Sequence, residues 1–215
     1  AAPDGERIEG LLAVVRSHDA ATLQQALQQE LVRHGLQRFV TETVAPLAAR
    51  IGQAWETGTL EIFEEHLFTE MAKRVLRQAV AALPAAGARP CVMLTTVPAE
   101  QHLLGLLMVE ALCALEGARC VPLGAEMPLM EIARAAGAHG ADVVALSFSA
   151  AFPHRQVPDV LSQLRAALPR GVELWIGGAG VRRTAAQPGL RALDGLDEVA
   201  AAVHDWRAAA GIAAK

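Results

Sequence analysis

A histidine follows a carboxylate by two positions in the segment VPAEQHLLG, which runs from Val97 to Gly105. Glu100 is close enough along the chain to hold one ring N–H of His102, which would fix the tautomer and leave the other ring nitrogen available to a metal ion. Gly105 has no side chain and would let a bulky group approach the backbone. A plainer interpretation fits the same residues, with Glu100 capping a helix and His102 solvated in a loop.

Two further motifs carry small residues at the ends of apolar runs. Ser147 and Ser149 would lie on one side of a strand, because alternate side chains of a strand point to the same face. Gly177 and Gly178 end another run. Together these residues would form a narrow slot with hydroxyl groups on one wall and bare backbone on the other. A Gly-Gly pair after a strand is by itself more often a simple turn.

The part of the chain that carries these motifs alternates between short apolar runs and helical segments. Strands are expected at 91–97, 120–124, 142–149 and 172–178, and helices at 100–116, 129–138, 157–168 and 196–209. This alternation predicts βαβ units and a parallel, doubly wound sheet. Ligands bind at the carboxyl ends of the strands in such sheets, and the three motifs lie at strand ends.

The first part of the chain is predicted to be helical to about Leu83. Helices are expected around 8–15, from Asp19 to Gly35, over 36–57 with Pro46 as a kink, and from about 60 to 80. Short loops between them predict an antiparallel four-helix bundle. A break at LPAAGARP then marks a linker, so we expect a bundle at 1–86 and an α/β domain at 87–215.

The composition excludes several classes of protein. The net charge is −4 and the basic residues are scattered, so the chain has no basic face for nucleic acid. Cys91, Cys113 and Cys120 lack C-x-x-C spacing and are expected to be reduced core thiols. No apolar run approaches the roughly 20 residues that span a bilayer, and the first residues do not resemble a secretory leader. We therefore expect a cytoplasmic protein with no membrane segment.

The motifs at the strand ends resemble the D-x-H-x-x-G, S-x-L and G-G pattern of cobalamin-binding domains. In this sequence they read Glu100-x-His102-x-x-Gly105, Ser147-x-Ser149 and Gly177-Gly178. The resemblance implies a flavodoxin-like, Rossmann-type domain in which His102 replaces the cofactor's own benzimidazole base as the lower cobalt ligand, with Glu100 orienting it. The freed nucleotide tail would enter the slot. Glutamate stands here for the usual aspartate and Ser149 for the usual leucine, and neither change removes the ligand.

The helical part carries a second resemblance. In WETGTLEIFEEH, Trp55 is followed after nine residues by Glu65-His66, which resembles the W-x9-E-H signature of the CarH and LitR light-responsive regulators of the MerR type. Short matches at GQAW, TTVP, PLGAEMPL and IGGAG extend the likeness over nearly the whole chain. The resemblance implies that Trp55, Glu65 and His66 form the upper pocket for adenosylcobalamin bound between the domains. From residue types alone, Trp55 equally fits a bundle-core anchor and Glu65-His66 a solvated face.

The resemblance implies a photosensory module of a transcriptional regulator and not an enzyme. Light would break the cobalt–carbon bond, the bundle would shift, and a homo-oligomer would change its assembly and its DNA binding through an N-terminal helix-turn-helix region outside this chain. Glu56 stands where the family has an upper-ligand histidine, and His66 is the candidate substitute. The alternatives are a stand-alone antirepressor, a corrinoid carrier of a methyltransferase system, and a relative that binds haem or a protein partner.

Overall fold

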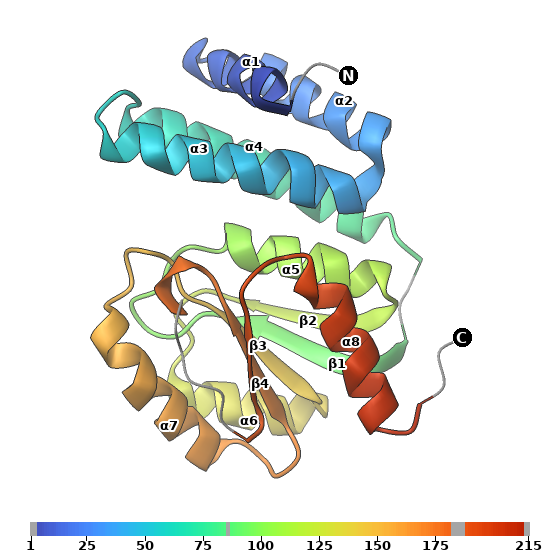
Figure 1. Ribbon diagram of the computed structural model, residues 1–215. Coiled ribbons are helices and arrows are strands. Elements are labelled where there is room, and N and C mark those ends of the chain that lie inside the picture. The colour runs from blue at the N-terminus through green and yellow to red at the C-terminus, as the bar shows by residue number, and fades with distance from the viewer. Residues whose placement is uncertain (1–3, 85–86, 182–187, 213–215) are drawn as a thin grey trace. The chain divides into compact units, whose positions relative to one another are not determined.

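The chain forms two compact units, Ala1–Ala82 and Leu83–Lys215, in a computed structural model that describes residues 4–84, 87–181 and 188–212 (Figure 1). The division falls four residues before the expected boundary at 86/87. Two residues of the expected linker, 85 and 86, lie outside the described residues, as do both chain ends.

Helices build the whole N-terminal unit. They are α1 (Asp4–Arg16), α2 (Ala20–Arg38), the π-helical turn η1 (Phe39–Val44), α3 (Ala45–Glu56) and α4 (Ile62–Ala81). Gly35 interrupts α2 with φ 73°, so the helical path changes where the sequence predicts a helix end. Pro46 lies at the start of α3, directly after η1, where it provides no N–H to the preceding helical turn, and the carbonyl oxygen of Glu42, four residues earlier, accepts a hydrogen bond from Arg7 instead. None of the helices in the described residues is both long and apolar enough to cross a membrane.

A polar cluster ties three of these helical segments together inside the N-terminal unit. The guanidinium of Arg7 on α1 donates to Glu30 on α2 at 2.9 Å and to the hydroxyl of Thr43 on η1 at 2.6 Å. Its other nitrogen donates to the carbonyl oxygen of Glu42 at 2.7 Å. Glu30 and Thr43 are buried, and a buried charge of this kind is tolerated because it is paired and hydrogen-bonded.

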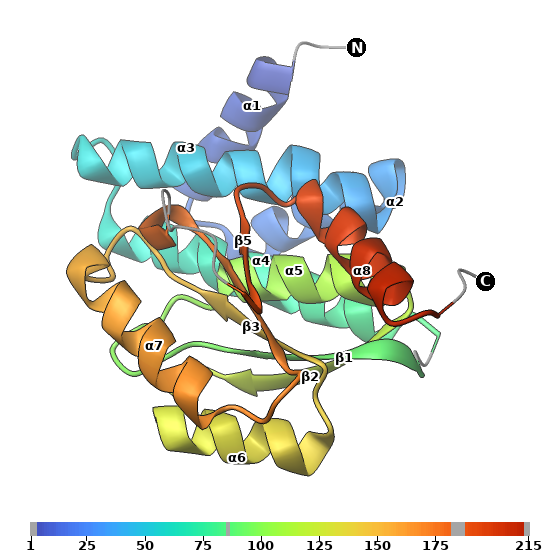
Figure 2. The same cartoon turned by 60° about the horizontal axis from the view of Figure 1, so that its bottom comes forward.

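The C-terminal unit is a five-stranded parallel sheet in the order β2-β1-β3-β4-β5. Its strands are β1 (Ala88–Thr95), β2 (Ala118–Gly124), β3 (Val143–Ser147), β4 (Glu173–Gly177) and β5 (Leu190–Leu193). The helices are α5 (Leu104–Leu115), α6 (Leu129–His139), α7 (Val157–Ala167) and α8 (Glu198–Ala209). In Figures 1 and 2, α5 and α8 cover one face and α6 and α7 the other. The chain reverses its direction of winding between β1 and β3, which is where ligands bind in this architecture.

The structure corrects the predicted elements in two places. The short strand β5 follows β4 at the edge of the sheet and was not predicted, because its four residues lack a continuous buried run. The helix expected from Glu100 begins instead at Leu104, so Glu100 and His102 lie in the loop between β1 and α5.

Asp142 joins the amino ends of two neighbouring strands. Its carboxylate accepts the backbone N–H of Cys91 at 2.7 Å and Nε of Arg89 at 3.2 Å. The Arg89 guanidinium also lies 5.1 Å from the ring of Trp206 on α8. Burial alone would raise the pKa of Asp142, but the hydrogen bonds from Arg89 and Cys91 outweigh it and lower that pKa.

We predict that Asp142→Asn destabilises the protein by about 1 to 3 kcal/mol at pH 7, because it weakens a buried, charge-assisted hydrogen-bond set. A carboxyl group with a lowered pKa in the folded state stabilises the fold above its unfolded pKa of about 4, and loses this effect as pH falls through the folded value. Urea unfolding measured from pH 7 down to about pH 3 should therefore show that the difference in free energy of unfolding between wild type and variant becomes smaller. Asp159→Asn, at an exposed position on α7, is the control and should have a smaller effect. A difference that stays constant with pH would contradict this account.

Candidate functional site

The predicted carboxylate–histidine pair forms in the loop after β1. Glu100 is buried, with 1% of its side chain exposed, whereas 62% of the His102 side chain is exposed. One carboxylate oxygen of Glu100 lies 2.7 Å from Nδ1 of His102 and accepts the backbone N–H of the same residue at 2.9 Å. The other oxygen accepts the backbone N–H of Ser149, beyond the end of β3, at 2.7 Å. Glu100 is thus the orienting partner of His102 and does not cap α5.

The charge of Glu100 determines which ring nitrogen of His102 is available. Burial opposes its ionisation, but the hydrogen bonds from His102 and Ser149 outweigh burial and lower the pKa of Glu100. An ionised carboxylate can only accept a hydrogen bond, so Nδ1 of His102 carries the hydrogen and, in the neutral ring, Nε2 keeps its lone pair. This leaves Nε2, the ring nitrogen that does not face Glu100, able to act as a ligand.

The surroundings of His102 favour a metal that brings its own ligands. Within the described residues, no group of three or more His, Cys, Asp or Glu side chains could hold a metal ion. An isolated imidazole suits a cobalt, iron or similar ion whose other positions are filled by a macrocycle. The donor set thus fits the axial position of a corrinoid cofactor.

A threonine that the sequence analysis did not single out holds this loop against the next one. Thr96, directly after β1, donates its hydroxyl to the carbonyl oxygen of Glu100 and accepts the backbone N–H of Glu126 at 2.9 Å. Ala99 and Glu126 both have positive φ, 69° and 56°, which is rare for residues with a side chain. The sequence offers only one signal for this role, a polar pair that ends an apolar strand.

The two serines meet this loop in different ways. The Ser147 hydroxyl, at the end of β3, lies where a side chain on Gly105 would be, since a Cβ added there would be 2.9 Å from it. Ser149 holds Glu100 through its backbone N–H. Its hydroxyl oxygen is buried near the same carboxylate but makes no hydrogen bond of normal geometry with any described residue. A side chain at position 105 would therefore displace the Ser147 hydroxyl from its present position.

The glycines after β4 allow two segments of backbone to touch. Gly178 has φ 98°, and a Cβ there would lie 2.3 Å from the carbonyl oxygen of Phe148. The same oxygen accepts the backbone N–H of Gly180 at 2.9 Å. Gly177 has more room, since its Cβ would lie 3.4 Å from the nearest atom, the carbonyl oxygen of Leu193. Positions 178 and 180 therefore require glycine, because a Cβ at either position would overlap the segment after β3.

A hollow elsewhere on the C-terminal unit does not involve these motifs. It has a volume of about 560 Å³ and lies at the amino ends of β4 and β5, beside Arg165, Arg170 and Glu173. This is the edge of the sheet opposite to the loop that carries His102. We therefore assign the site from the hydrogen-bonded residues and not from the hollow.

The predicted residues of the N-terminal unit lie around the turn between α3 and α4. Trp55 is 52% exposed near the end of α3, so it is not a buried anchor of the bundle. Glu65, in the first turn of α4, accepts the Thr69 hydroxyl at 2.8 Å and lies 3.7 Å from Nδ1 of the exposed His66. Glu56 ends α3 and is exposed. Trp55, Glu56 and His66 are thus exposed side chains, whereas both carboxylate oxygens of Glu65 lie close to a neighbouring side chain.

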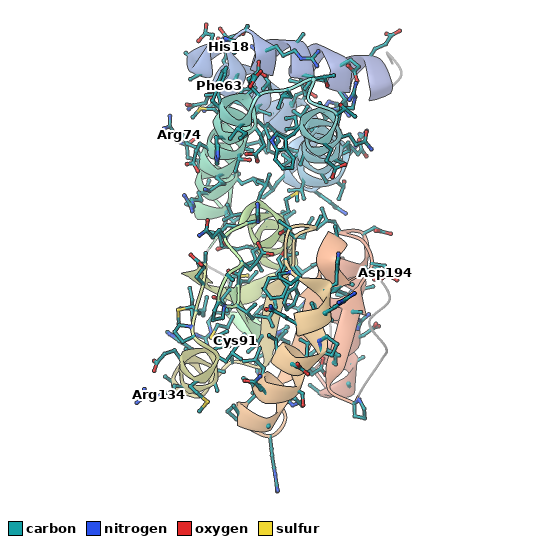
Figure 3. All side chains as sticks on the ribbon, turned by 90° about the vertical axis from the view of Figure 1, so that its left-hand side faces the viewer. His18, Phe63, Arg74, Cys91, Arg134 and Asp194 are labelled. Carbon is teal, nitrogen blue, oxygen red and sulfur yellow. The ribbon has the colours of Figure 1, made fainter. Side chains whose placement is uncertain are left out.

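The start of α4 is held by the turn before α2. Nε2 of His18 lies 2.8 Å from the buried Glu64 carboxylate, whose other oxygen accepts the N–H of Glu61 in a capping box. The rings of His18 and Phe63 meet edge to face at 5.1 Å (Figure 3). The hydrogen bond from Glu61 and, after the opposing effect of burial, the contact with His18 lower the pKa of Glu64. The first turn of α4, which carries Glu65 and His66, is therefore held in place by these contacts.

Comparison with known proteins gives consistent matches for both units. Two family models, each described as a B12 binding domain, match residues 90–203 and 7–79. The chain is 34% identical over 174 residues to the HTH-type transcriptional repressor CarH of Myxococcus xanthus, covering 81% of this chain. It is 35% identical over 124 residues, 57% of this chain, to the repressor CarA of the same organism. The chain spans only 58% and 42% of the length of these two repressors.

A solved structure matches the fold over nearly the full length. The monomethylamine corrinoid protein of Methanosarcina barkeri has a TM-score of 0.72 and covers 94% of this chain and 99% of its own. The sequence identity is 15%, so the likeness concerns the fold alone. It agrees with the predicted arrangement of a helical part followed by a parallel sheet with helices on its faces.

We predict that alanine has very different effects at the two adjacent glycines. Gly178→Ala should destabilise the protein by about 3 kcal/mol or more, because the residue has positive φ and its Cβ would overlap the Phe148 backbone. Gly177→Ala is the matched control and should cost less than about 1 kcal/mol, since its Cβ would make an ordinary contact. Urea unfolding followed by circular dichroism measures both values. Equal effects would mean that the close backbone contact is wrong.

Proposed function

Because the chain belongs to the B12-binding domain family, we propose that it is the cofactor-sensing region of a light-responsive transcriptional regulator. Family membership identifies cobalamin as its cofactor. The observation that carries the proposal is the exposed His102 ring with Nδ1 held by the buried Glu100. The identity to two transcriptional repressors over much of the chain supports a regulatory role.

On the C-terminal unit, His102 would bind the cobalt of cobalamin from the lower side through Nε2. Glu100 would keep the ring in the correct tautomer and orientation, as carboxylates do for metal-bound histidines in general. Gly105, Ser147, Ser149 and Gly177 would line the space for the displaced nucleotide tail, and the contact of Gly178 with the Phe148 backbone would form its floor. The support for this assignment is that these residues lie in the loop after β1, in the first turn of α5, or at the carboxyl ends of β3 and β4 and directly after them.

On the N-terminal unit, Trp55, Glu65 and His66 would contact the upper ligand, for which we propose adenosyl. Adenosylcobalamin, when bound, supplies a cobalt–carbon bond that visible light breaks. The exposed Trp55 ring offers apolar surface for the adenine base, and the Glu65 carboxylate can accept hydrogen bonds from ribose hydroxyls. After loss of the upper ligand, Glu56 or His66 would be the candidate side chain to bind the cobalt in its place.

The output would be a change in self-association that alters DNA binding in the cytoplasm. A ligand shifts a protein between two states only by the contacts that differ between them, and loss of the adenosyl group removes contacts to the helical unit. DNA binding would belong to a region outside this chain, because the chain matches only part of each repressor and has a net charge of −4.

A corrinoid carrier that serves a methyltransferase is the second candidate. The structural match to a corrinoid protein is compatible with it, since both functions use the same fold. A carrier must leave its upper face open to partner enzymes, whereas the sensor would enclose an adenosyl group. The identity to repressors favours the sensor, either within a longer regulator or as a separate antirepressor.

We predict that His102→Ala weakens cobalamin binding by at least about tenfold, because the axial ligand is lost and the loss even of a residue that only orients a ligand has an effect of this size. The bound cobalt(II) form should also lose the electron paramagnetic resonance coupling to a protein nitrogen, which is identified in wild type by labelling with nitrogen-15 histidine. His204→Ala removes an exposed histidine of α8 that pairs with Glu116 and is the control. Unchanged affinity and coupling in His102→Ala would remove the basis of the assignment.

We predict that the protein loaded with adenosylcobalamin in darkness changes both its absorption spectrum and its elution volume after green light. The methylcobalamin complex should form less tightly, because a methyl group makes none of the contacts proposed for Trp55 and Glu65. Size-exclusion chromatography and titration measure these outcomes. Equal affinity for both forms would favour the carrier, and a constant size after illumination would exclude the switch while leaving cofactor binding intact.

A further inference from the structure

We propose that Thr96 is a positioning residue that sets the orientation of His102 by joining its loop to the loop between β2 and α6. This inference rests on the proposed role of His102 as the cobalt ligand. Thr96 touches neither the imidazole nor any group expected to contact the cofactor. It acts through Glu100, whose carbonyl oxygen it holds and whose carboxylate holds the His102 ring.

Every polar group of Thr96 is used between the two loops. The residue is fully buried, with 0% of its surface exposed. Its hydroxyl donates to the carbonyl oxygen of Glu100 and accepts the N–H of Glu126 at 2.9 Å. Its own N–H donates to the carbonyl oxygen of Gly124 at 3.3 Å, and its carbonyl oxygen accepts the N–H of Met127 at 3.0 Å. The Thr96 hydroxyl therefore connects the two loops through one hydrogen bond to each of them.

One of the two residues that the hydroxyl contacts has strained backbone, and the other directly follows a strained residue. Glu126 itself has φ 56°, and Ala99, directly before Glu100, has φ 69°. Residues with a side chain stay in the left-handed region only where surrounding contacts hold them there. The Thr96 hydroxyl supplies such a contact on both sides. Without it, Ala99 is free to relax, and Glu100 would turn away from the position in which it holds His102.

The neighbouring threonine provides a matched control. Thr95 is also fully buried and donates its hydroxyl to the carbonyl oxygen of Gly124 at 2.8 Å. Thr95→Val and Thr96→Val therefore both replace a buried hydroxyl by a methyl group of similar size at the end of β1. Only the change at Thr96 removes a hydrogen bond to Glu100.

The experiment compares Thr96→Val, Thr96→Ala, Thr96→Ser and Thr95→Val in the whole chain. In cofactor-free protein, nuclear magnetic resonance of histidine ring nitrogens reports the His102 tautomer, which should be a single Nδ1–H form in wild type. Thr96→Val and Thr96→Ala should give mixed tautomers. Thr96→Ser, which keeps the hydroxyl, should restore the single form, and Thr95→Val should retain it even if its unfolding temperature falls.

The same variants are then titrated with cobalamin. Thr96→Val should bind about tenfold more weakly, and only part of its bound cobalt(II) form should show coupling to a histidine nitrogen. A role in folding alone would reduce the amount of folded protein but leave every bound cofactor coupled. A single wild-type tautomer in both Thr96→Val and Thr96→Ala would overturn the inference. If wild type binds cobalamin without nitrogen coupling, the proposed function fails instead, and the tautomer result still decides the role of Thr96.

Discussion

The hydrogen bond between Glu100 and His102 is the contact on which the rest of the site depends. A histidine in an exposed loop is normally free to rotate and to exchange its proton between the two ring nitrogens. Here the buried Glu100 carboxylate accepts hydrogen bonds from the His102 ring, from the backbone N–H of His102 and from the backbone N–H of Ser149. These donors lower the pKa of Glu100 despite its burial, and the ionised carboxylate in turn keeps the hydrogen of the neutral His102 ring on Nδ1.

The topology of the sheet explains why three separated segments meet at this carboxylate. Because β1 pairs with β3, the loops that follow these two strands leave the same edge of the sheet side by side. The helices α5 and α7 then continue on opposite faces of the sheet. The Glu100 carboxylate, in the loop after β1, accepts the backbone N–H of Ser149 after β3, so the histidine is held by both loops and not only by its own.

The sequence was sufficient for those features that depend on local pattern. The alternation of strands and helices, the helix break at Gly35 and the resemblance to cobalamin-binding domains each rest on residues close together in the chain, and the fold class and family are confirmed. The strand β5 was missed because its signal is only four residues long. The start of α5 was placed too early because Glu100 fits a helix cap as well as a histidine partner. The roles of Trp55, Glu65 and His66 stay predictions.

Contacts between distant segments were beyond a single sequence. In the sequence, Thr96 resembles any strand residue. Its role depends on a hydrogen bond from the backbone N–H of Glu126, thirty positions away, to its hydroxyl. Gly177 and Gly178 were expected to provide a wall of bare backbone, whereas the space beside Gly178 is occupied by the Phe148 backbone. That packing has an evolutionary consequence. A floor made of main chain against main chain offers no side chain whose size or polarity could be exchanged, so relatives that diverge in ligand preference must acquire it from the surrounding loops or from the helical unit.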